Sequence, residues 1–185
     1  MAVRARTLRD LIRLWQTVEP QDFNATFAVL VEPIRLLIDR DRPTSAGLAS
    51  DYYRRLRMAS RTFGTMPEIA LPGPIDMAVL SESLAVTGPV ARGKALRAGK
   101  TPAEAARRAL VATSGSVSRH VLNAGRQTIA DTMQADRANP RWRRVTSGQP
   151  CDFCTMLSRR GAVYSETTVE FRAHDHCACM PAPAF

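Results

Sequence analysis

The residues best suited to chemistry are cysteines and histidines gathered near the C-terminus. Cys151 and Cys154 form a C-x-x-C pair, and nineteen residues later comes the segment 174–179, His-Asp-His-Cys-Ala-Cys. All four cysteines and two of the three histidines of the chain fall between positions 151 and 179. Two thiolates three residues apart can share one ion from a tight turn, and a ligand pair from a distant segment completes a tetrahedral site. The sequence therefore predicts a bound Zn²⁺ ion.

More ligands are present than such a site needs. Four are required, and the candidate metal ligands are Cys151, Cys154, His174, Cys177 and Cys179, with His176 as a further competitor. In an extended backbone Cys177 and Cys179 point to one face, which gives an all-cysteine site. In a turn His174 and Cys177 converge, which gives three thiolates and one imidazole. Either set is closed to water and predicts a structural ion, with disulfide formation as the rival interpretation.

The composition restricts where the protein resides and what it contacts. The 185 residues carry a net charge of +9, and of 26 basic residues only Lys94 and Lys100 are lysine, which leaves 24 arginines. Arginine suits phosphates and carboxylates, so the charge predicts nucleic acid or an acidic protein surface as partner, with codon bias in a GC-rich genome as the alternative. No apolar run reaches the ~20 residues of a membrane span and no secretory signal is evident, so no membrane partner is expected. A reducing cytosol favours metal over disulfides.

Hydrophobic spacing predicts helices along most of the chain. Helices are expected at 7–18, beginning at a cap on Thr7, at 21–39, and from a cap at Thr44 or Ser45 to Arg61. Pro33 lies inside the second of these and predicts a kink or break, and a turn is expected at 41–43. Residues 62–74 are rich in glycine and proline, as is typical of a linker.

The clearest helical pattern covers residues 101–135. Its first residues, Thr101-Pro-Ala-Glu104, supply a capping threonine, a proline at the first helical position and an acid three residues after the cap. Beyond this helix, short strands are expected at 142–146 and 162–164, on either side of a helical segment at 151–157.

These patterns predict a mainly α protein, with a helical N-terminal and central region and a small C-terminal zinc-stabilised α+β module. The expected divisions are an N-terminal helical arm (1–62), a linker with short helices (63–100), a long central helix (101–136) and a Cys/His zinc-knuckle module (137–185). The last is too small to fold by apolar burial alone, so metal binding would supply its stability.

Two patterns approach a nucleotide-binding or catalytic motif without completing it. Gly88 to Lys94 matches G-x-x-x-x-G-K, but Ala95 stands where a P-loop needs a magnesium-binding hydroxyl, and no buried strand precedes it. His120 follows Ser116 by one helical turn, yet no acidic group that would orient the imidazole is evident. We therefore expect no catalytic residues and no small-molecule substrate.

Two basic segments are candidates for partner contact. The third helix interleaves Tyr52, Tyr53 and Met58 with four arginines, which predicts a nucleic-acid surface, a solvated face or a contact with another subunit. The second segment precedes the knuckle, and its candidate nucleic-acid or partner contacts are Arg137, Arg141, Trp142, Arg143 and Arg144.

Several motifs, taken together, resemble those of one phage protein family. They are His120-Val-Leu-Asn-Ala-Gly-Arg126, Trp142-Arg-Arg-Val-Thr-Ser-Gly148, Pro150-Cys-Asp-Phe-Cys-Thr-Met-Leu157, Arg160-Gly-Ala-Val-Tyr164 and His174-Asp-His-Cys-Ala-Cys179. In this order they resemble the Mu F-like minor head proteins of tailed bacteriophages, of the actinobacteriophage type, over residues 100–183, and the N-terminal helices only loosely.

The resemblance implies a minor capsid protein of the virion, made in the host cytoplasm and placed at the portal vertex or capsid interior. Its implied partners are the portal protein, the major capsid protein and packaged DNA, and its implied roles are head morphogenesis and DNA packaging or ejection. Some relatives carry toxin or protease domains, which are not expected here because the chain ends at Phe185.

Two alternative functions follow from the same residues. Some related chains are labelled capsid maturation proteases, which predicts an enzyme that uses Ser116 or a neighbouring serine with His120. A cytosolic zinc-ribbon protein would instead bind nucleic acid through the arginines around Trp142.

Overall fold

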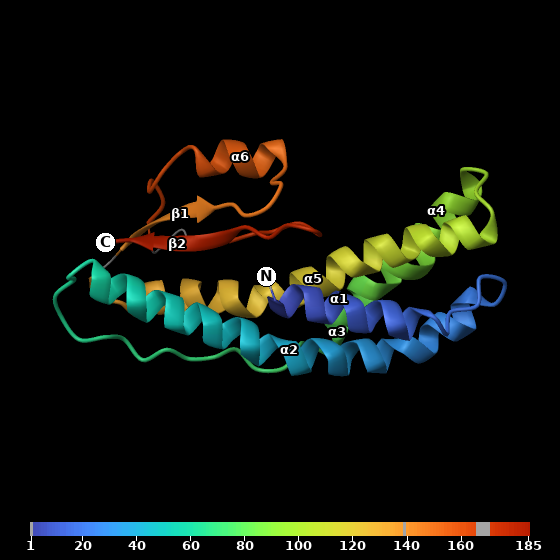
Figure 1. Cartoon of the computed structure of the whole chain (residues 1–185), viewed down its shortest axis with the longest axis horizontal. Coiled ribbons are helices and arrows are strands. Elements are labelled where there is room, and N and C mark those ends of the chain that lie inside the picture. The colour runs from blue at the N-terminus through green and yellow to red at the C-terminus, as the bar shows by residue number, and fades with distance from the viewer. Residues whose placement is uncertain (1, 139, 166–170) are drawn as a thin grey trace. The chain divides into compact units, whose positions relative to one another are not determined.

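The structure is a computed structural model that describes residues 2–138, 140–165 and 171–185 (Figure 1). Its elements in chain order are α1 (Ala2–Trp15), α2 (Phe23–Ala59), α3 (Met77–Ala85), the π-helical turn η1 (Val86–Val90), α4 (Ala91–Arg97), α5 (Pro102–Ala135), β1 (Arg141–Val145), α6 (Asp152–Ser158) and β2 (Met180–Ala184). The expected fold class, mainly α with a small C-terminal α+β module, is confirmed.

The chain forms two compact units, each built from two separate segments. Unit 1 comprises Met1–Asp41 and Pro74–Val121, and unit 2 comprises Arg42–Gly73 and Leu122–Phe185. The long helices α2 and α5 therefore contribute one part to each unit. The four-part division predicted along the sequence stays a prediction.

Helix α1 begins earlier than the sequence pattern predicts. The expected cap, Thr7, lies inside the helix, where its hydroxyl donates to the carbonyl oxygen of Val3 at 2.9 Å and lies 2.6 Å from Oδ2 of Asp41. In unit 1 this helix packs its apolar face against the first part of α2 (Figure 1), and Trp15 contacts Phe23 and Phe27 in an aromatic cluster. The predicted start at Thr7 is wrong because Thr7 serves tertiary packing instead of capping.

Helix α2 is continuous over 37 residues, so the chain does not break at Pro33, one of the two alternatives predicted there, and the predicted turn at 41–43 is wrong. Each proline removes a single backbone donor from the helical ladder, and the neighbouring hydrogen bonds can persist. Buried side chains lie on both sides of the prolines, among them Ile34 and Ile38 before Pro43 and Ala46 after it. Burial of this face stabilises the helix against the loss of two hydrogen bonds.

The P-loop-like segment is helical. Gly88 and Pro89 lie in η1, where the missing N–H of proline accompanies a widened turn, and α4 follows directly. A methyl group at Gly88 would overlap the ring of Phe27, so glycine is required here for close packing within unit 1. The segment does not form the loop of backbone N–H groups that cradles a phosphate.

Helix α5 confirms the most distinct helical pattern of the sequence. The N–H of Thr101 donates to Oε2 of Glu104 at 2.9 Å, and the N–H of Glu104 donates to Oγ1 of Thr101 at 3.3 Å, which is a reciprocal capping box. Further along, a Cβ at Gly125 would lie 2.9 Å from the carbonyl oxygen of Ser45, so α5 and α2 pack closely within unit 2.

In unit 2, β1 and β2 form an antiparallel pair in which Trp142 lies opposite Pro183. The backbone N–H of Trp142 points away from β2 and donates to the carbonyl oxygen of Tyr164 at 2.8 Å. Pro183 therefore occupies a position that needs no donor toward β1. The predicted strand at 142–146 is confirmed, whereas the strand expected at 162–164 forms an isolated bridge at Tyr164 and the second strand lies at the C-terminus.

Candidate metal centre

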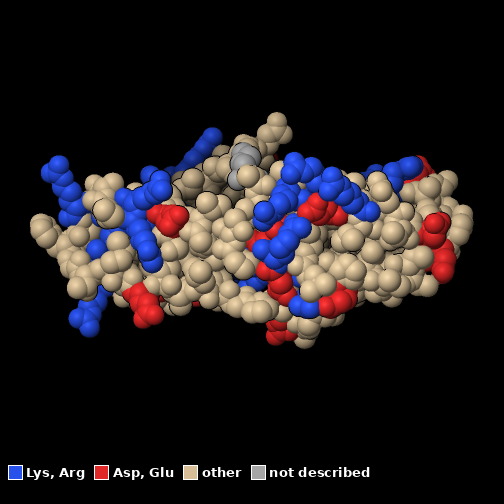
Figure 2. All heavy atoms as spheres, turned by 60° about the horizontal axis from the view of Figure 1, so that its bottom comes forward, with Lys and Arg blue, Asp and Glu red and all other residues tan. Residues whose placement is uncertain are grey.

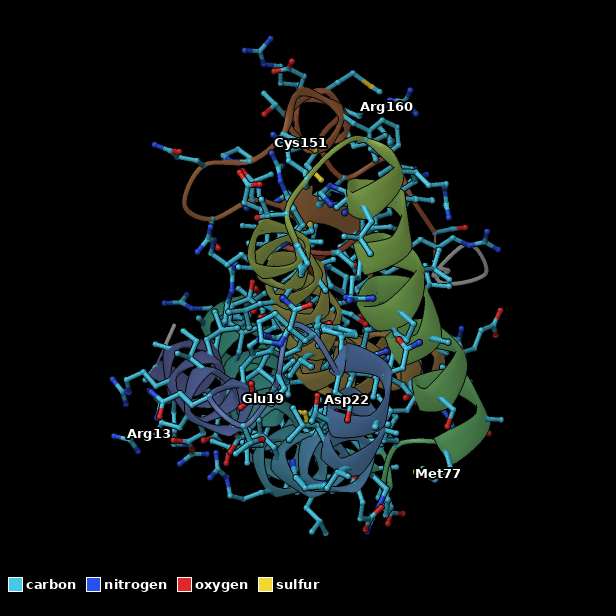
Figure 3. The ribbon with its side chains drawn as sticks, turned by 90° about the vertical axis from the view of Figure 1, so that its right-hand side faces the viewer. Arg13, Glu19, Asp22, Met77, Cys151 and Arg160 are labelled. Carbon is cyan, nitrogen blue, oxygen red and sulfur yellow. The ribbon has the colours of Figure 1, made fainter. Side chains whose placement is uncertain are left out.

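Helix α6 positions the first two candidate ligands. Cys151 is its N-cap residue, with extended backbone angles, and the Cys151 sulfur accepts the N–H of Cys154 at 3.4 Å. One helical turn places Cys154 on the same side, where its side chain is buried. Figure 3 labels Cys151 and Arg160, which flank this helix. The predicted helical segment at 151–157 is confirmed.

A tight turn after residue 173 supplies the other candidates. The N–H of Cys177 donates to the carbonyl oxygen of His174 at 3.2 Å, and His176 between them has a left-handed backbone (φ +63°). Beyond the turn, Cys177 and Cys179 are both buried on one side of the chain. The turn brings His174 close to Cys151 and Cys154, and the backbone beyond it aligns Cys177 with Cys179 beside Cys154. Which four of these residues bind an ion stays a prediction.

The donor atoms of these segments gather into two groups that share Cys154. In the part of the chain that the structure describes, one group is Cys151, Cys154 and His174, the other is Cys154, Cys177 and Cys179, and the donor atoms within each group lie within 4.8 Å of one another. The imidazole of His176 belongs to neither group. All four cysteines are free thiols, so the structure contains no disulfide among them.

Two of the distances between donor atoms match those expected around a zinc ion. Zinc–sulfur bonds of about 2.3 Å and zinc–nitrogen bonds of about 2.0–2.1 Å at tetrahedral angles place two sulfurs about 3.8 Å apart, and a sulfur about 3.6 Å from a nitrogen. The Cys154 sulfur lies 3.7 Å from the Cys177 sulfur and 3.7 Å from Nε2 of His174. The Cys151 sulfur lies 3.1 Å from the same Nε2, slightly closer than an ion would require. Within the described residues no four donor atoms lie within 4.8 Å of one another, so a four-ligand site would require the two groups to draw together around the ion.

Hydrogen bonds prepare two of the thiols for the thiolate form. The N–H of Cys154 and the imidazole of His174 lower the pKa of the Cys151 thiol to about 7. Burial acts to raise the pKa of Cys177, but the N–H of Cys179, the neighbouring thiols of Cys179 and Cys154 and the charge of Arg126 together outweigh it, and the net shift is downward. Burial raises the pKa of Cys154 and of Cys179. A bound cation would deprotonate these buried thiols, since a coordinated thiol exists as thiolate.

The imidazole of His174 is oriented for metal binding. Its Nδ1 lies 2.7 Å from the carbonyl oxygen of Asp175, and this hydrogen bond, followed by that to Cys151, raises the pKa of His174. With Nδ1 donating, Nε2 faces the two sulfurs as the acceptor atom. A backbone carbonyl that fixes one ring nitrogen in this way is the usual support of a zinc-binding histidine.

Two buried arginines adjoin the cysteines, and the sequence pattern did not indicate that either belongs to the site. Arg126 of α5 donates from Nη2 to the carbonyl oxygen of Cys177 at 2.6 Å and from Nε to that of Cys179 at 2.9 Å. Arg144 of β1 lies over the ring of Phe171 at 4.0 Å, with Nη1 4.0 Å from the Cys154 sulfur. Three thiolates, one imidazole and Zn²⁺ carry one net negative charge, which these guanidiniums offset. The motif His120-Val-Leu-Asn-Ala-Gly-Arg126 was the one sequence signal that pointed to Arg126.

The predicted contact strip divides between the core and the surface. Trp142 and Arg144 are only 4% and 6% exposed, since alternate residues of β1 face the core of unit 2. Arg141 and Arg143 are exposed on the other face, as is Arg137 before the strand. The predicted stacking and phosphate contacts from Trp142 and Arg144 would require this core to open.

The histidine of α5 lies in a separate buried polar cluster. Nε2 of His120 lies 3.1 Å from Oγ of Ser83, which lies 2.7 Å from Oγ of Ser116 and accepts a hydrogen bond from Arg119 at 2.9 Å. His120 is therefore connected to Ser116 through Ser83, a residue that the sequence pattern did not indicate. Ser116 is fully buried.

The distribution of charge on the surface indicates a binding site less clearly than the cysteines do. On the face shown in Figure 2, basic side chains are interspersed with acidic ones. In unit 1 several arginines form ion pairs, including Arg40 with Asp10 at 2.8 Å and Arg35 with Asp39 at 2.7 Å. Among the described residues, no helix combines the length and apolarity of a membrane span.

The fold and the Cys/His cluster define a helical protein with a small module suited to a metal ion. Comparison with protein families matches the whole chain, residues 1–185, to the family described as VG15 protein. The chain therefore belongs to the VG15 family, a family of viral gene products of the phage type. Comparisons with curated proteins and with solved structures give no match.

Proposed function

We propose that this chain is a minor head protein of a tailed bacteriophage, related to the Mu F-like proteins. In this proposal it resides at the portal vertex or the capsid interior and acts in head assembly and in DNA packaging or ejection. The observation that carries the proposal is membership of the phage-type VG15 family over residues 1–185. The ordered motifs from His120 to Cys179 support the finer assignment, because they resemble those of the Mu F-like minor head proteins.

The metal centre is proposed as a structural zinc site. Cys151, Cys154, His174 and Cys177 would supply four donors, with Cys179 as the alternative fourth ligand. The bound ion would join α6 to the turn at 174–177, whose shared buried cluster consists of the cysteines Cys154, Cys177 and Cys179. A set of four protein ligands leaves no coordination position for water, which favours structural over catalytic use.

We propose that the chain is not an enzyme. The fully buried Ser116 cannot meet a polypeptide substrate without a rearrangement of unit 1, and His120 is only 4% exposed. His120→Ala should accordingly leave processing of the phage coat protein unchanged, and loss of processing would contradict this part of the proposal.

The assembly role is tested by locating the protein in particles. Purified virions and procapsids of the parent phage should contain this chain, and its removal by a nonsense mutation should give fewer DNA-filled heads while coat synthesis continues. Mass spectrometry of the particles and electron microscopy of the lysate are the measurements. Virions that lack the chain, together with normal yields of filled heads from the mutant, would contradict the proposal.

A further inference from the structure

The turn that follows α2 combines a fixed backbone with an exposed aromatic side chain. The guanidinium of Arg57 donates to three successive carbonyl oxygens, those of Phe63 at 3.3 Å, Gly64 at 3.3 Å and Thr65 at 3.2 Å. Arg57 is only 5% exposed, whereas the side chain of Phe63 is 94% exposed. The contacts that hold this turn are made by its main chain and do not use the aromatic ring.

The arginine that holds the turn is itself fixed inside unit 2. Nε of Arg57 donates to Oδ2 of Asp136 at 2.7 Å and Nη2 donates to Oδ1 at 3.2 Å, which makes a bidentate ion pair. The hydroxyl of Tyr53 donates to the same Oδ2 at 2.9 Å. Arg61 and Gly64 adopt left-handed backbone angles (φ +50° and +93°), so the chain reverses tightly around the guanidinium. The turn is thus held in one shape before any partner arrives.

The side chains near Phe63 have the composition of a protein interface. The large exposed side chains of this segment are Tyr52, Arg54, Arg55, Met58, Arg61 and Phe63. Between Tyr52 and Thr65 the sequence has no Lys, Asp or Glu. Interface cores are enriched in aromatic residues, Met and Arg and depleted in Lys, Asp and Glu. Met58 is 73% exposed, and its thioether has no hydrogen-bond donor for a phosphate. The composition therefore favours a protein partner over duplex DNA.

We propose that Phe63 is an anchor residue that inserts into an apolar pocket bordered by carboxylates on another head protein. The segment carries the exposed Arg54, Arg55 and Arg61 against one flanking acid, Asp51, while Arg57 is paired with Asp136, so its net charge is positive. A preorganised turn binds with a smaller loss of conformational entropy than a flexible one. The inference rests on the proposed function, which names the portal and major capsid proteins as partners.

The test measures binding of the purified full-length chain to procapsids. The procapsids are assembled from the portal, scaffold and major capsid proteins of the parent phage without this chain, and binding is followed by co-sedimentation at several concentrations. We expect Phe63→Ala and Phe63→Asp to weaken binding at least about tenfold, as loss of an anchor side chain does. The matched control is Phe153→Ala, which removes another exposed phenylalanine, from α6, and should leave binding unchanged.

Each other outcome overturns the inference in a distinguishable way. If both Phe63 variants bind procapsids as the wild type does, the anchor is wrong and the assembly role stands. If the wild-type chain itself does not bind, the proposed function fails and the inference fails with it. If the variants lose affinity for a 30-base-pair duplex DNA probe but keep affinity for procapsids, the segment serves nucleic acid instead. Circular dichroism should show unchanged folding, because the ring makes almost no contact with the rest of the chain.

Discussion

The guanidinium of Arg126 lies 2.6 Å from the carbonyl oxygen of Cys177, and this hydrogen bond connects the long helix α5 to the backbone that carries two candidate metal ligands. A second hydrogen bond, 2.9 Å long, reaches the carbonyl oxygen of Cys179. Because both acceptors belong to the main chain, Arg126 fixes the path of the chain and leaves the two thiols directed at Cys154. Its positive charge also helps lower the pKa of Cys177.

Arg126→Lys tests this connection. Lysine keeps the charge but has no planar fork to reach both carbonyl oxygens, so at least one buried acceptor loses its donor. We expect unit 2 to lose about 2–3 kcal/mol of unfolding free energy, measured by urea denaturation. Arg159→Lys, at an exposed position after α6, is the matched control and should change stability little. Equal stability of the two variants would show that the hydrogen bonds to the cysteine backbone are not important.

Cys151→Ser tests whether the metal holds the C-terminal module together. Serine is a poor zinc ligand, so residues 140–165 and 171–185 should lose protection from hydrogen exchange while the first turns of α5 keep theirs. Met156→Ser, an exposed substitution in the same helix, is the control and should leave protection unchanged. Protease resistance of Cys151→Ser equal to that of the wild type would count against a structural ion.

Asp136 should make unit 2 sensitive to acid. Burial acts to raise the pKa of Asp136, but hydrogen bonds from Arg57, the N–H of Ala138 and Tyr53 outweigh it, and the net shift is downward. The unfolded chain, with an ordinary aspartate pKa of about 3.9, therefore binds a proton at higher pH than the folded chain does. The stabilisation is present above about pH 4 and is lost as the pH falls through the folded value.

Asp136→Asn should be less stable than the wild type by about 3 kcal/mol at pH 7, because it leaves the buried Arg57 without its counter-charge. Its stability should also depend less on pH below about pH 4, which denaturant titrations across pH would measure. Asp131→Asn is the control, since burial raises the pKa of Asp131 and its loss removes no acid-sensitive stabilisation. An unchanged acid dependence in Asp136→Asn would contradict the assignment.

Two glycines of the P-loop-like segment should respond oppositely to alanine. Gly88→Ala pushes a methyl group into the ring of Phe27 and should destabilise unit 1 by about 1–3 kcal/mol. Gly93→Ala lies in α4, where the nearest atom is the mobile Nη1 of Arg97 at 3.5 Å, and should stabilise the protein by about 0.5–1 kcal/mol. Thermal denaturation compares the pair. If both variants bound a nucleotide less well than the wild type, the segment would have a phosphate-binding role after all.

Features that depend on neighbouring residues were predictable from the sequence. The capping box at Thr101, the helical segment after Cys151 and the grouping of cysteines with His174 all arise within a few positions of one another or repeat a known ligand spacing. Local hydrogen bonds decide such features, so their residue types specify them directly.

Features that depend on distant packing were not predictable in the same way. Helix α2 continues past Pro33 because buried residues on both sides stabilise it, and Pro183 is accepted in β2 because Trp142 bonds to Tyr164 instead. The partner of Arg57, Asp136, lies 79 positions away along the chain. Tertiary contacts of this kind override local propensity, and one sequence does not reveal which residues they bring together.

The central claim is that a closed tetrahedral ion joins α6 to the turn at 174–177, and elemental analysis with native mass spectrometry tests it most directly. Protein purified under reducing conditions without added metal should carry about one zinc ion per chain. Chelation at neutral pH should remove the ion and abolish hydrogen-exchange protection from residue 140 onward. Reduced protein that contains no metal and yet keeps full protection in that region would contradict the account.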